Sequence, residues 1–375
     1  MVEVPKNSKA MVLTEYGKPL EMREYPIPEV EPRGILVKVE MAGICGSDVH
    51  QWRGKLGLKS TLPTIQGHET VGRIVKLGEG RTTDVVGESI QVGDLIMWAQ
   101  IDCGECFWCK VTRQPNLCPK RAYYGLWASS NADEYPHLLG GFAEYEYVIP
   151  KTDIVKVPHA LSAEEAIGVS CAFRSVIAGF ERLGGVGLQS DIVIQGAGPI
   201  GLYSTVLARE SGANKIIVVG APQKRLDLAK KWGADHVIDI DEIKDPQKRI
   251  DKILNLVNGR GVDIVIEGAG VVSAFGEGLE MVRRGGKYLV LGQTSQAATS
   301  IVPGNITFKN LDIIGSMSGT IQHYYKGLQF IKSKRSRYNF AEIVTHKYRL
   351  EEANDALAAM EEGKSIKPVI DNRDR

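Results

Sequence analysis

The sequence predicts an α/β protein with two architectures, a β-rich domain followed by a doubly wound parallel sheet. Short alternating runs, frequent Gly and Pro, and the lack of a long helical period indicate β structure over the first 150 residues. From about Ser190, strands alternate with helices, and a glycine-rich turn follows the first of these strands. A chain of 375 residues is long enough for two or three domains, each with its own core.

The β-rich part is predicted from three short runs. Residues 35–42 largely alternate apolar with polar or small side chains, which is the period of a half-buried strand. Residues 71–77 form a second such run, and a third starts within 92–98 after the turn VGD. The polar stretches 79–91 and 123–141 are predicted to be surface loops.

The doubly wound part is predicted from six apolar runs that recur every 20 to 30 residues or so. The first run is 191–195 (DIVIQ), and a helix is expected over 202–211. The other runs begin near Lys215, His236, Asp263, Lys287 and Leu311, with helices expected over 223–232 and 246–257.

The turn GAGPIG, residues 196–201, has the pattern of a dinucleotide-binding loop. Gly196 permits the tight turn, Gly198 lets the backbone approach a pyrophosphate, and Gly201 packs the helix on the strand. The following helix offers free N–H groups and a positive dipole end to phosphates. The alternative is a glycine-rich turn without a ligand, but its place between a strand and a helix favours the dinucleotide.

Four cysteines form the strongest local signal. Cys103, Cys106 and Cys109 are separated by two residues each, and Cys118 follows after a gap of eight. Two-residue gaps let successive thiolates fold around one ion, and four thiolates complete the closed shell of a structural zinc. The alternatives are a pair of disulfides or a redox CxxC, which four clustered cysteines without a thioredoxin-like setting disfavour.

The stretch 43–69 carries a second set of candidate ligands. Cys45 and His68 supply a thiolate and an imidazole, the ligand types that select zinc over magnesium or calcium. Asp48 and Glu69 could orient or supplement these ligands. The alternative is a buried structural cysteine beside a satisfied core histidine.

Composition restricts the partners and the compartment. With 46 basic and 45 acidic residues the net charge is +1, so we expect no nucleic-acid partner. The N-terminal sequence has no apolar core of signal-peptide length, and no run is long enough to span a bilayer, so we expect no membrane association. Six cysteines, four of them within residues 103–118, suit a reducing compartment, and we expect a cytoplasmic protein.

A Cys-x-Ser-x-x-x-His segment, a GHE, a four-Cys cluster and a later GxGxxG occur in this order. In this order, and over essentially the whole chain, the motifs resemble those of the zinc-dependent medium-chain alcohol dehydrogenase family. The resemblance implies a GroES-like catalytic domain over residues 1–160 that is completed by 319–375. It also implies a Rossmann domain over 161–318 and an active site in the cleft.

The resemblance also implies a ligand set for a catalytic zinc. Cys45 and His68 would bind it together with Cys171, which lies in GVSCAFRS before the Rossmann domain. Glu69 would hydrogen-bond to groups around these ligands without binding the metal, or would serve as an alternate ligand. We therefore expect two Zn²⁺ per chain, one catalytic and one structural.

The expected chemistry is hydride transfer between an alcohol and a nicotinamide. Zinc makes an alcohol in its open position more acidic, and the resulting alkoxide can release a hydride. By resemblance, Ser47 receives the alcohol proton and His50 passes it to solvent through the cofactor ribose. Asp48 would fix the ring of His68. The alternative is that Ser47 only forms a turn and His50 is a surface residue.

The resemblance places several further residues against the dinucleotide. Arg225 would lie near the adenine ribose and Lys367 near the pyrophosphate, although each could equally be a solvated cation. The other cofactor-binding residues are expected within the glycine turn and at the end of the fifth strand, at Gly196, Gly198, Pro199, Ile200, Gly201, Val290, Leu291 and Gly292.

The chain departs from the family pattern at three positions. The gap of eight before Cys118 is usually seven, and Gly46 stands where several members carry a residue that touches phosphate. The third departure is Gly220, nineteen residues after Gly201, where an acidic residue would bind the ribose hydroxyls. The absence of an acidic residue at position 220, with Arg225 nearby, favours NADP(H) as the cofactor, or the use of both NADP(H) and NAD(H). The alternative is NAD(H) bound through backbone contacts.

Two other functional classes are open to this sequence. A polyol or L-threonine dehydrogenase of the same superfamily is the neighbouring alternative, but those enzymes mostly lack a cysteine at the position of Cys171. A non-catalytic homologue would be expected to lose zinc ligands, which this chain keeps. We expect a small-molecule alcohol substrate and a homodimer or homotetramer.

Overall fold

The computed structural model describes residues 4–57, 60–126, 131–292 and 297–373. The predicted surface loop 123–141 therefore lies partly outside the described residues. Within its described part, residues 123–126 and 138–141 are buried, so the prediction of a surface loop is wrong for both ends of this stretch. None of the helices described is both long enough and apolar enough to cross a membrane.

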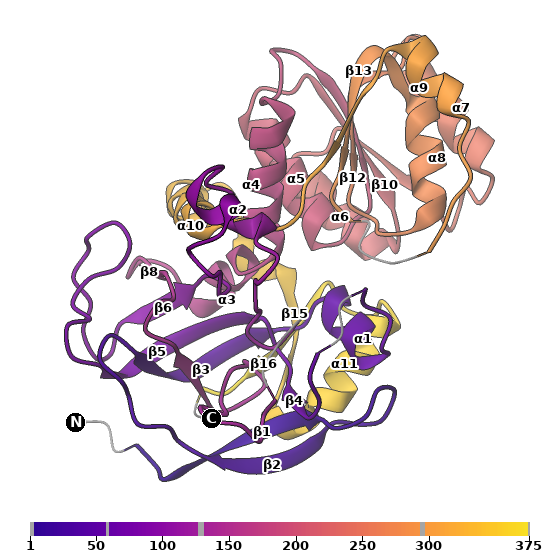
Figure 1. The fold of residues 1–375 in the computed structure, drawn as a ribbon. Coiled ribbons are helices and arrows are strands. Elements are labelled where there is room, and N and C mark those ends of the chain that lie inside the picture. Colours follow the sequence, from indigo (N-terminus) through magenta and orange to yellow (C-terminus); the bar gives the residue numbers. More distant parts are fainter. Residues whose placement is uncertain (1–3, 58–59, 127–130, 293–296, 374–375) are drawn as a thin grey trace. The chain divides into compact units, whose positions relative to one another are not determined.

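The chain divides into two compact units. The first is Met1–Arg174 with Gly319–Arg375, and the second is Ser175–Ser318 (Figure 1). The second unit ends at Ser318 and begins at Ser175, which is later than the expected residue 161. The reason is that α3 (Ala163–Ala166) packs against the first unit's β3 (Ile35–Gly43).

Two sheets build the first unit, and most of their strands are antiparallel. A three-stranded sheet has the order β2-β1-β4, and a seven-stranded sheet has the order β15-β16-β3-β5-β6-β8, with β7 paired to β3. Beyond β3, the strands are β1 (Asn7–Leu13), β2 (Glu21–Pro26), β4 (Thr64–Ile65), β5 (Glu69–Leu77), β6 (Leu95–Trp98), β7 (Tyr145–Val148), β8 (Ile154–Lys156), β15 (Val344–Tyr348) and β16 (Lys367–Asp371).

Short helices connect these strands. Besides α3 they are α1 (Gly46–Trp52), α2 (Phe107–Lys110), η1 (Pro115–Leu117), η2 (Ile167–Val169), α10 (Ile321–Lys334), η3 (Phe340–Ile343), η4 (Leu350–Glu352) and α11 (Ala353–Glu361). The expected β-rich character is confirmed, and the C-terminal segment completes the larger sheet because β16 pairs with β3.

The second unit contains a six-stranded sheet in the order β11-β10-β9-β12-β13-β14, with all neighbours parallel. Its strands are β9 (Asp191–Gln195), β10 (Lys215–Gly220), β11 (His236–Asp239), β12 (Val262–Glu267), β13 (Val282–Val290) and β14 (Asp312–Gly315). In chain order within this unit the sequence is 3-2-1-4-5-6, which is the Rossmann arrangement, so the predicted doubly wound sheet is confirmed.

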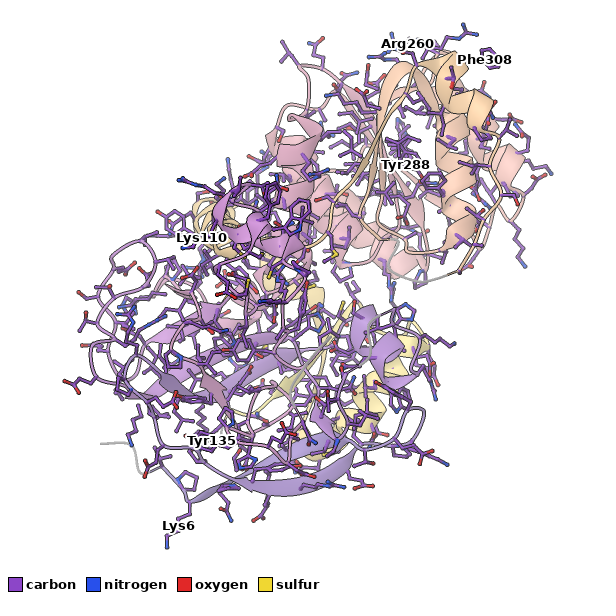
Figure 2. The ribbon with its side chains drawn as sticks, viewed as in Figure 1. Lys6, Lys110, Tyr135, Arg260, Tyr288 and Phe308 are labelled. Atoms are coloured by element: carbon purple, nitrogen blue, oxygen red, sulfur yellow. The ribbon has the colours of Figure 1, made fainter. Side chains whose placement is uncertain are left out.

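Helices lie on both sides of this sheet (Figure 1). They are α4 (Ala172–Leu183), which starts in the first unit, and then α5 (Pro199–Glu210), α6 (Gln223–Lys231), α7 (Pro246–Leu256), α8 (Val272–Met281) and α9 (Pro303–Lys309). Figure 2 shows Tyr288 among these layers, where it is fully buried, whereas Phe308 on α9 is 81% exposed.

Candidate active site and metal centres

The four clustered cysteines meet on the loop around α2 and η1. Sγ–Sγ separations are 3.5 Å for Cys103 and Cys118, 3.6 Å for Cys106 and Cys109, 3.8 Å for Cys106 and Cys118, and 4.0 Å for Cys103 and Cys109. Tetrahedral zinc with bonds of ~2.3 Å requires thiolates ~3.8 Å apart. All four cysteines are free, so the spacing fits one metal ion rather than two disulfides.

The protonation of this cluster is uneven. Hydrogen bonds from the backbone of Glu105 and then of Cys106 lower the pKa of the Cys103 thiol to about 6. Burial, followed by the neighbouring Cys106 thiol, raises the pKa of Cys109 to about 12. Crowded thiols resist simultaneous ionisation, and a divalent cation at their centre removes this obstacle.

A second group joins Cys45, His68, Glu69 and Cys171, whose ligand atoms all lie within 4.8 Å of one another. Cys45 is the N-cap of α1, His68 and Glu69 lie at the start of β5, and Cys171 directly precedes α4. The loop, the strand and the helix thus bring together residues that are up to 126 positions apart in the sequence. Two thiols and an imidazole are a donor set that suits zinc.

Asp48 organises this group from a fully buried position. Its Oδ2 accepts a hydrogen bond from the backbone N–H of Cys45 at 2.8 Å, and its Oδ1 lies 2.9 Å from Nδ1 of His68. Nε2 of His68 is therefore free to face the other ligands. Burial acts to lower the pKa of His68. The charge of Asp48 outweighs this effect and raises the pKa well above its usual range. The raised pKa favours a proton on both ring nitrogens, and a metal ion on Nε2 would take the place of the proton there.

Lys367 lies against the same group. Its Nζ is 2.8 Å and 2.6 Å from the two carboxylate oxygens of Glu69, and both side chains are almost fully buried. Burial acts to lower the pKa of Lys367. The negative charge of Glu69 outweighs this effect and raises the pKa of Lys367. The structure thus places Lys367 on the carboxylate of Glu69 in this candidate metal site, and its contact with pyrophosphate stays a prediction.

Ser47 and His50 lie on α1, three residues apart and hence on neighbouring turns of one helix face. Oγ of Ser47 is 3.9 Å from Sγ of Cys45. Partial burial, followed by the charge of Lys55, lowers the pKa of His50, which favours the neutral ring.

The glycine turn has the backbone that a dinucleotide loop needs. Gly196 takes φ +104°, and a Cβ on Gly201 would lie 1.8 Å from the carbonyl oxygen of Gly196. Gly198 caps α5 and has open space on its Cα, where a phosphate could approach. Pro199 and Ile200 form the first turn of α5, which begins three residues before the predicted start because Pro suits the first helical position.

Gly220 ends β10 beside this turn. A Cβ there would lie 2.8 Å from the backbone nitrogen of Ala197 and 2.8 Å from its Cβ, so a larger residue needs a backbone shift. Close packing is thus a second reason for glycine, besides room for a phosphate. Arg225 lies partly buried at the start of α6, and burial lowers its pKa.

Val290 ends β13, and the next two backbone N–H groups, of Leu291 and Gly292, donate to the carbonyl oxygen of Glu267 at 2.9 Å and 3.0 Å. Sequence reasoning missed Glu267 and the pairing of Lys367 with Glu69. A signal existed for the first, because Glu267 ends an otherwise mostly apolar run, and glutamate is rarely buried without a partner. No local signal existed for the second.

Family models match both parts of the chain. The model described as "Alcohol dehydrogenase GroES-like domain" matches residues 31–159, and "Zinc-binding dehydrogenase" matches 199–333. The chain is 34% identical over 369 residues to a 5-exo-hydroxycamphor dehydrogenase of Pseudomonas putida, covering 97% of this chain and 99% of the relative. It is 30% identical to an L-threonine 3-dehydrogenase of Rhizobium etli, covering 97% and 98%.

Solved structures of dehydrogenases are similar to this chain over nearly its whole length. An alcohol dehydrogenase from Thermotoga maritima matches with a TM-score of 0.89 at 35% identity, covering 97% of this chain and 99% of that one. A zinc-binding dehydrogenase from Sinorhizobium meliloti, solved bound to NADP, matches with a TM-score of 0.81 at 27% identity, covering 98% and 99%. The predicted resemblance is confirmed: the chain belongs to the zinc-dependent medium-chain dehydrogenase/reductase family.

Proposed function

We propose that this protein is a zinc- and NAD(P)-dependent alcohol dehydrogenase that interconverts an alcohol with an aldehyde or ketone. The observation that carries the proposal is the gathering of Cys45, His68, Glu69 and Cys171 within 4.8 Å, in a chain that also has a Rossmann glycine turn. The four-residue group suits a catalytic metal. The glycine turn suits the nicotinamide dinucleotide that would accept the hydride.

In this proposal Cys45, His68 and Cys171 would hold the catalytic zinc. When bound, zinc supplies Lewis acidity that makes an alcohol hydroxyl easier to deprotonate. Glu69 has a different role while Lys367 neutralises it, because a paired carboxylate is a weaker ligand. Its carboxylate oxygen nevertheless lies within 4.8 Å of the other ligand atoms, so Glu69 stays an alternate ligand.

Cys103, Cys106, Cys109 and Cys118 would hold the structural zinc. Their four thiols leave no open position for a substrate, so this ion would stabilise the lobe and take no part in turnover. The eight-residue gap before Cys118 is taken up by η1 and by Arg113, which has φ +55°.

The proton would leave through Ser47 and His50. Ser47 lies close to the ligand Cys45, and the lowered pKa of His50 keeps its ring available as a base. Asp48 would hold His68 in one tautomer through the contact at Nδ1.

For the cofactor, we propose NADP(H) or dual use. The absence of a carboxylate at Gly220 removes the repulsion of a 2′-phosphate, and Arg225 lies near. The NADP-bound relative supports this choice. The close packing of Gly220 on Ala197 supports the NAD(H) alternative, because it explains the glycine without a phosphate.

Polyol and L-threonine oxidation stay as alternatives, and L-threonine dehydrogenase is among the relatives. The test is a panel of primary, secondary and polyhydroxy alcohols and L-threonine, each assayed with NAD⁺ and NADP⁺. Oxidation of monohydric alcohols above all others supports the proposal. Selective oxidation of L-threonine or sorbitol would favour the alternative, and no turnover with any member would contradict both.

We further propose a homodimer or homotetramer in the cytoplasm. β14 is the outer strand of its sheet, with β13 as its neighbour, and Ile313 on it is 36% exposed. Exposed Val302 (65%) and Phe308 (81%) lie on the adjoining segment, so a second copy could cover this edge. Light scattering after gel filtration tests the assembly. The free cysteines fit a reducing compartment.

A further inference from the structure

Two loops at the carboxyl ends of β12 and β13 are in direct backbone contact. A Cβ on Gly270 would lie 2.9 Å from the carbonyl oxygen of Gly292, and a Cβ on Gly292 would lie 2.6 Å from the nitrogen of Gly270. Neither position has room for a side chain. In a Rossmann sheet this end of the strands is where the ligand binds.

Glu267, the last residue of β12, joins these two loops. Its Oε1 accepts a hydrogen bond from the N–H of Gly270 at 2.6 Å, and its Oε2 accepts one from Gly292 at 3.1 Å. Its own carbonyl oxygen accepts from Leu291 at 2.9 Å and from Gly292 at 3.0 Å, so the N–H of Gly292 is shared between the backbone and the side chain of Glu267. The residue is fully buried.

This arrangement suits a side chain that accepts hydrogen bonds at both of its terminal atoms. An ionised glutamate is an acceptor at both oxygens, whereas a glutamine presents an acceptor at one end and an N–H₂ donor at the other. Glutamine would therefore leave the N–H of Gly270 or of Gly292 facing a donor. Hydrogen bonds to a buried charge are also the stronger kind.

A buried carboxylate is costly unless its hydrogen bonds compensate. Here it holds two short loops, 268–270 and 290–292, at the carboxyl ends of β12 and β13. The glycine turn for the pyrophosphate follows β9, and β12 and β13 lie on the side of β9 opposite to β10, so the nicotinamide half of a bound dinucleotide would extend toward these loops. The adenine end of the cofactor is proposed to lie elsewhere, at Gly220 and Arg225.

We infer that Glu267 is a positioning residue for the nicotinamide half of the cofactor. Glu267 fixes the backbone of residues 268–270 and 290–292. The N–H groups of Leu291 and Gly292 already donate to Glu267, so the carbonyl groups of Leu291 and Gly292 are the groups held in place for the carboxamide. Glu267 acts through these peptides and not on the substrate. The inference rests on the proposed dinucleotide function.

The test compares Glu267→Gln with Glu277→Gln, measured on the full chain. Glu277 lies on the same unit's α8, and its carboxylate pairs with Arg249 at 2.6 Å, so the control also removes a largely buried carboxylate. Dissociation constants are measured for NADPH and NADH, and for 2′,5′-ADP, which carries the adenine half alone.

Glu267→Gln is expected to weaken binding of the intact dinucleotides by about tenfold or more, since one charged hydrogen bond is lost. Binding of 2′,5′-ADP should change by less than about twofold. This fragment is expected to contact Gly220 and Arg225, on β10 and α6, whereas the loops that Glu267 holds follow β12 and β13, and effects at separate sites are usually independent. The control should change neither.

Equal weakening of the fragment and of the intact dinucleotides would overturn the inference in favour of a general structural role. Unchanged dinucleotide binding would overturn it as well. If Glu267→Gln does not fold, Gly270→Ala pushes the same loops apart with the carboxylate in place and should show the same selective loss. Failure of the unaltered protein to bind either dinucleotide would instead contradict the proposed function, and the inference with it.

Discussion

Replacement of Glu146 by Gln is predicted to stabilise the first unit increasingly as the pH rises. Glu146 lies on β7, opposite Val37 of β3, and is fully buried, with neither carboxylate oxygen in a hydrogen bond among the described residues. Burial raises its pKa to about 8 from 4.5, against a smaller lowering by the adjacent Thr70 and Trp98. The folded chain therefore keeps a proton that the unfolded chain releases.

The sign follows from proton binding. Between pH 4.5 and pH 8 the unfolded state loses the proton first, so the free energy of unfolding falls as the pH rises, and above pH 8 it falls no further. At pH 7 the loss is about 3 kcal/mol and at pH 5.5 about 1 kcal/mol, at about 1.4 kcal/mol per pH unit. Glutamine does not titrate, so the variant escapes this loss.

The assay is thermal unfolding of Glu146→Gln and the unaltered protein from pH 5 to pH 8. With about 2–4 °C per kcal/mol for a unit of this size, the difference in Tm should grow by about 4 °C or more between pH 5.5 and pH 7. The difference between the two proteins cancels the titration of all other groups. A Tm difference that stays constant across this range would refute the reasoning.

Three further predictions address the site. Cys106→Ser should lower the zinc content by one ion per chain and lower Tm, with turnover per folded chain retained, because a closed shell cannot spare a ligand; metal analysis that shows no loss would contradict this. His50→Ala should slow alcohol oxidation most at low pH, where fewer bases can accept the proton, and an unchanged pH profile of kcat/KM would count against the relay. Arg225→Ala should raise KM for NADP⁺ at least about tenfold and KM for NAD⁺ little, since an arginine–phosphate contact is worth at least one charged hydrogen bond. This variant is preferable to Gly220→Asp, whose side chain would collide with Ala197.

Much of the fold was predictable because its signals are local. Strand–helix alternation fixed the Rossmann sheet, and two-residue gaps predicted that Cys103, Cys106 and Cys109 would gather. Cys171 could be assigned only through the family resemblance, since nothing nearby in the sequence marks it as a partner of Cys45. The structure brings both cysteines into one group.

Contacts between distant segments could not be predicted. Lys367 and Glu69 are 298 residues apart, and their pairing depends on β16 lying beside β3. The close approach of Gly220 to Ala197 likewise depends on the register of β9 and β10. A sequence pattern can suggest why Gly220 or Lys367 is present. Which explanation holds depends on the residue packed against each, Ala197 or Glu69, and only the folded structure shows that residue.

The central claim is a zinc-dependent dehydrogenase with one catalytic and one structural ion. Its most direct test is the zinc content of protein purified without added metal, measured by mass spectrometry alongside His68→Ala. We predict two zinc ions per chain in the unaltered protein and one in the variant, because Cys103, Cys106, Cys109 and Cys118 do not depend on His68. One ion or none in the unaltered protein, or the same content in both proteins, would contradict the account.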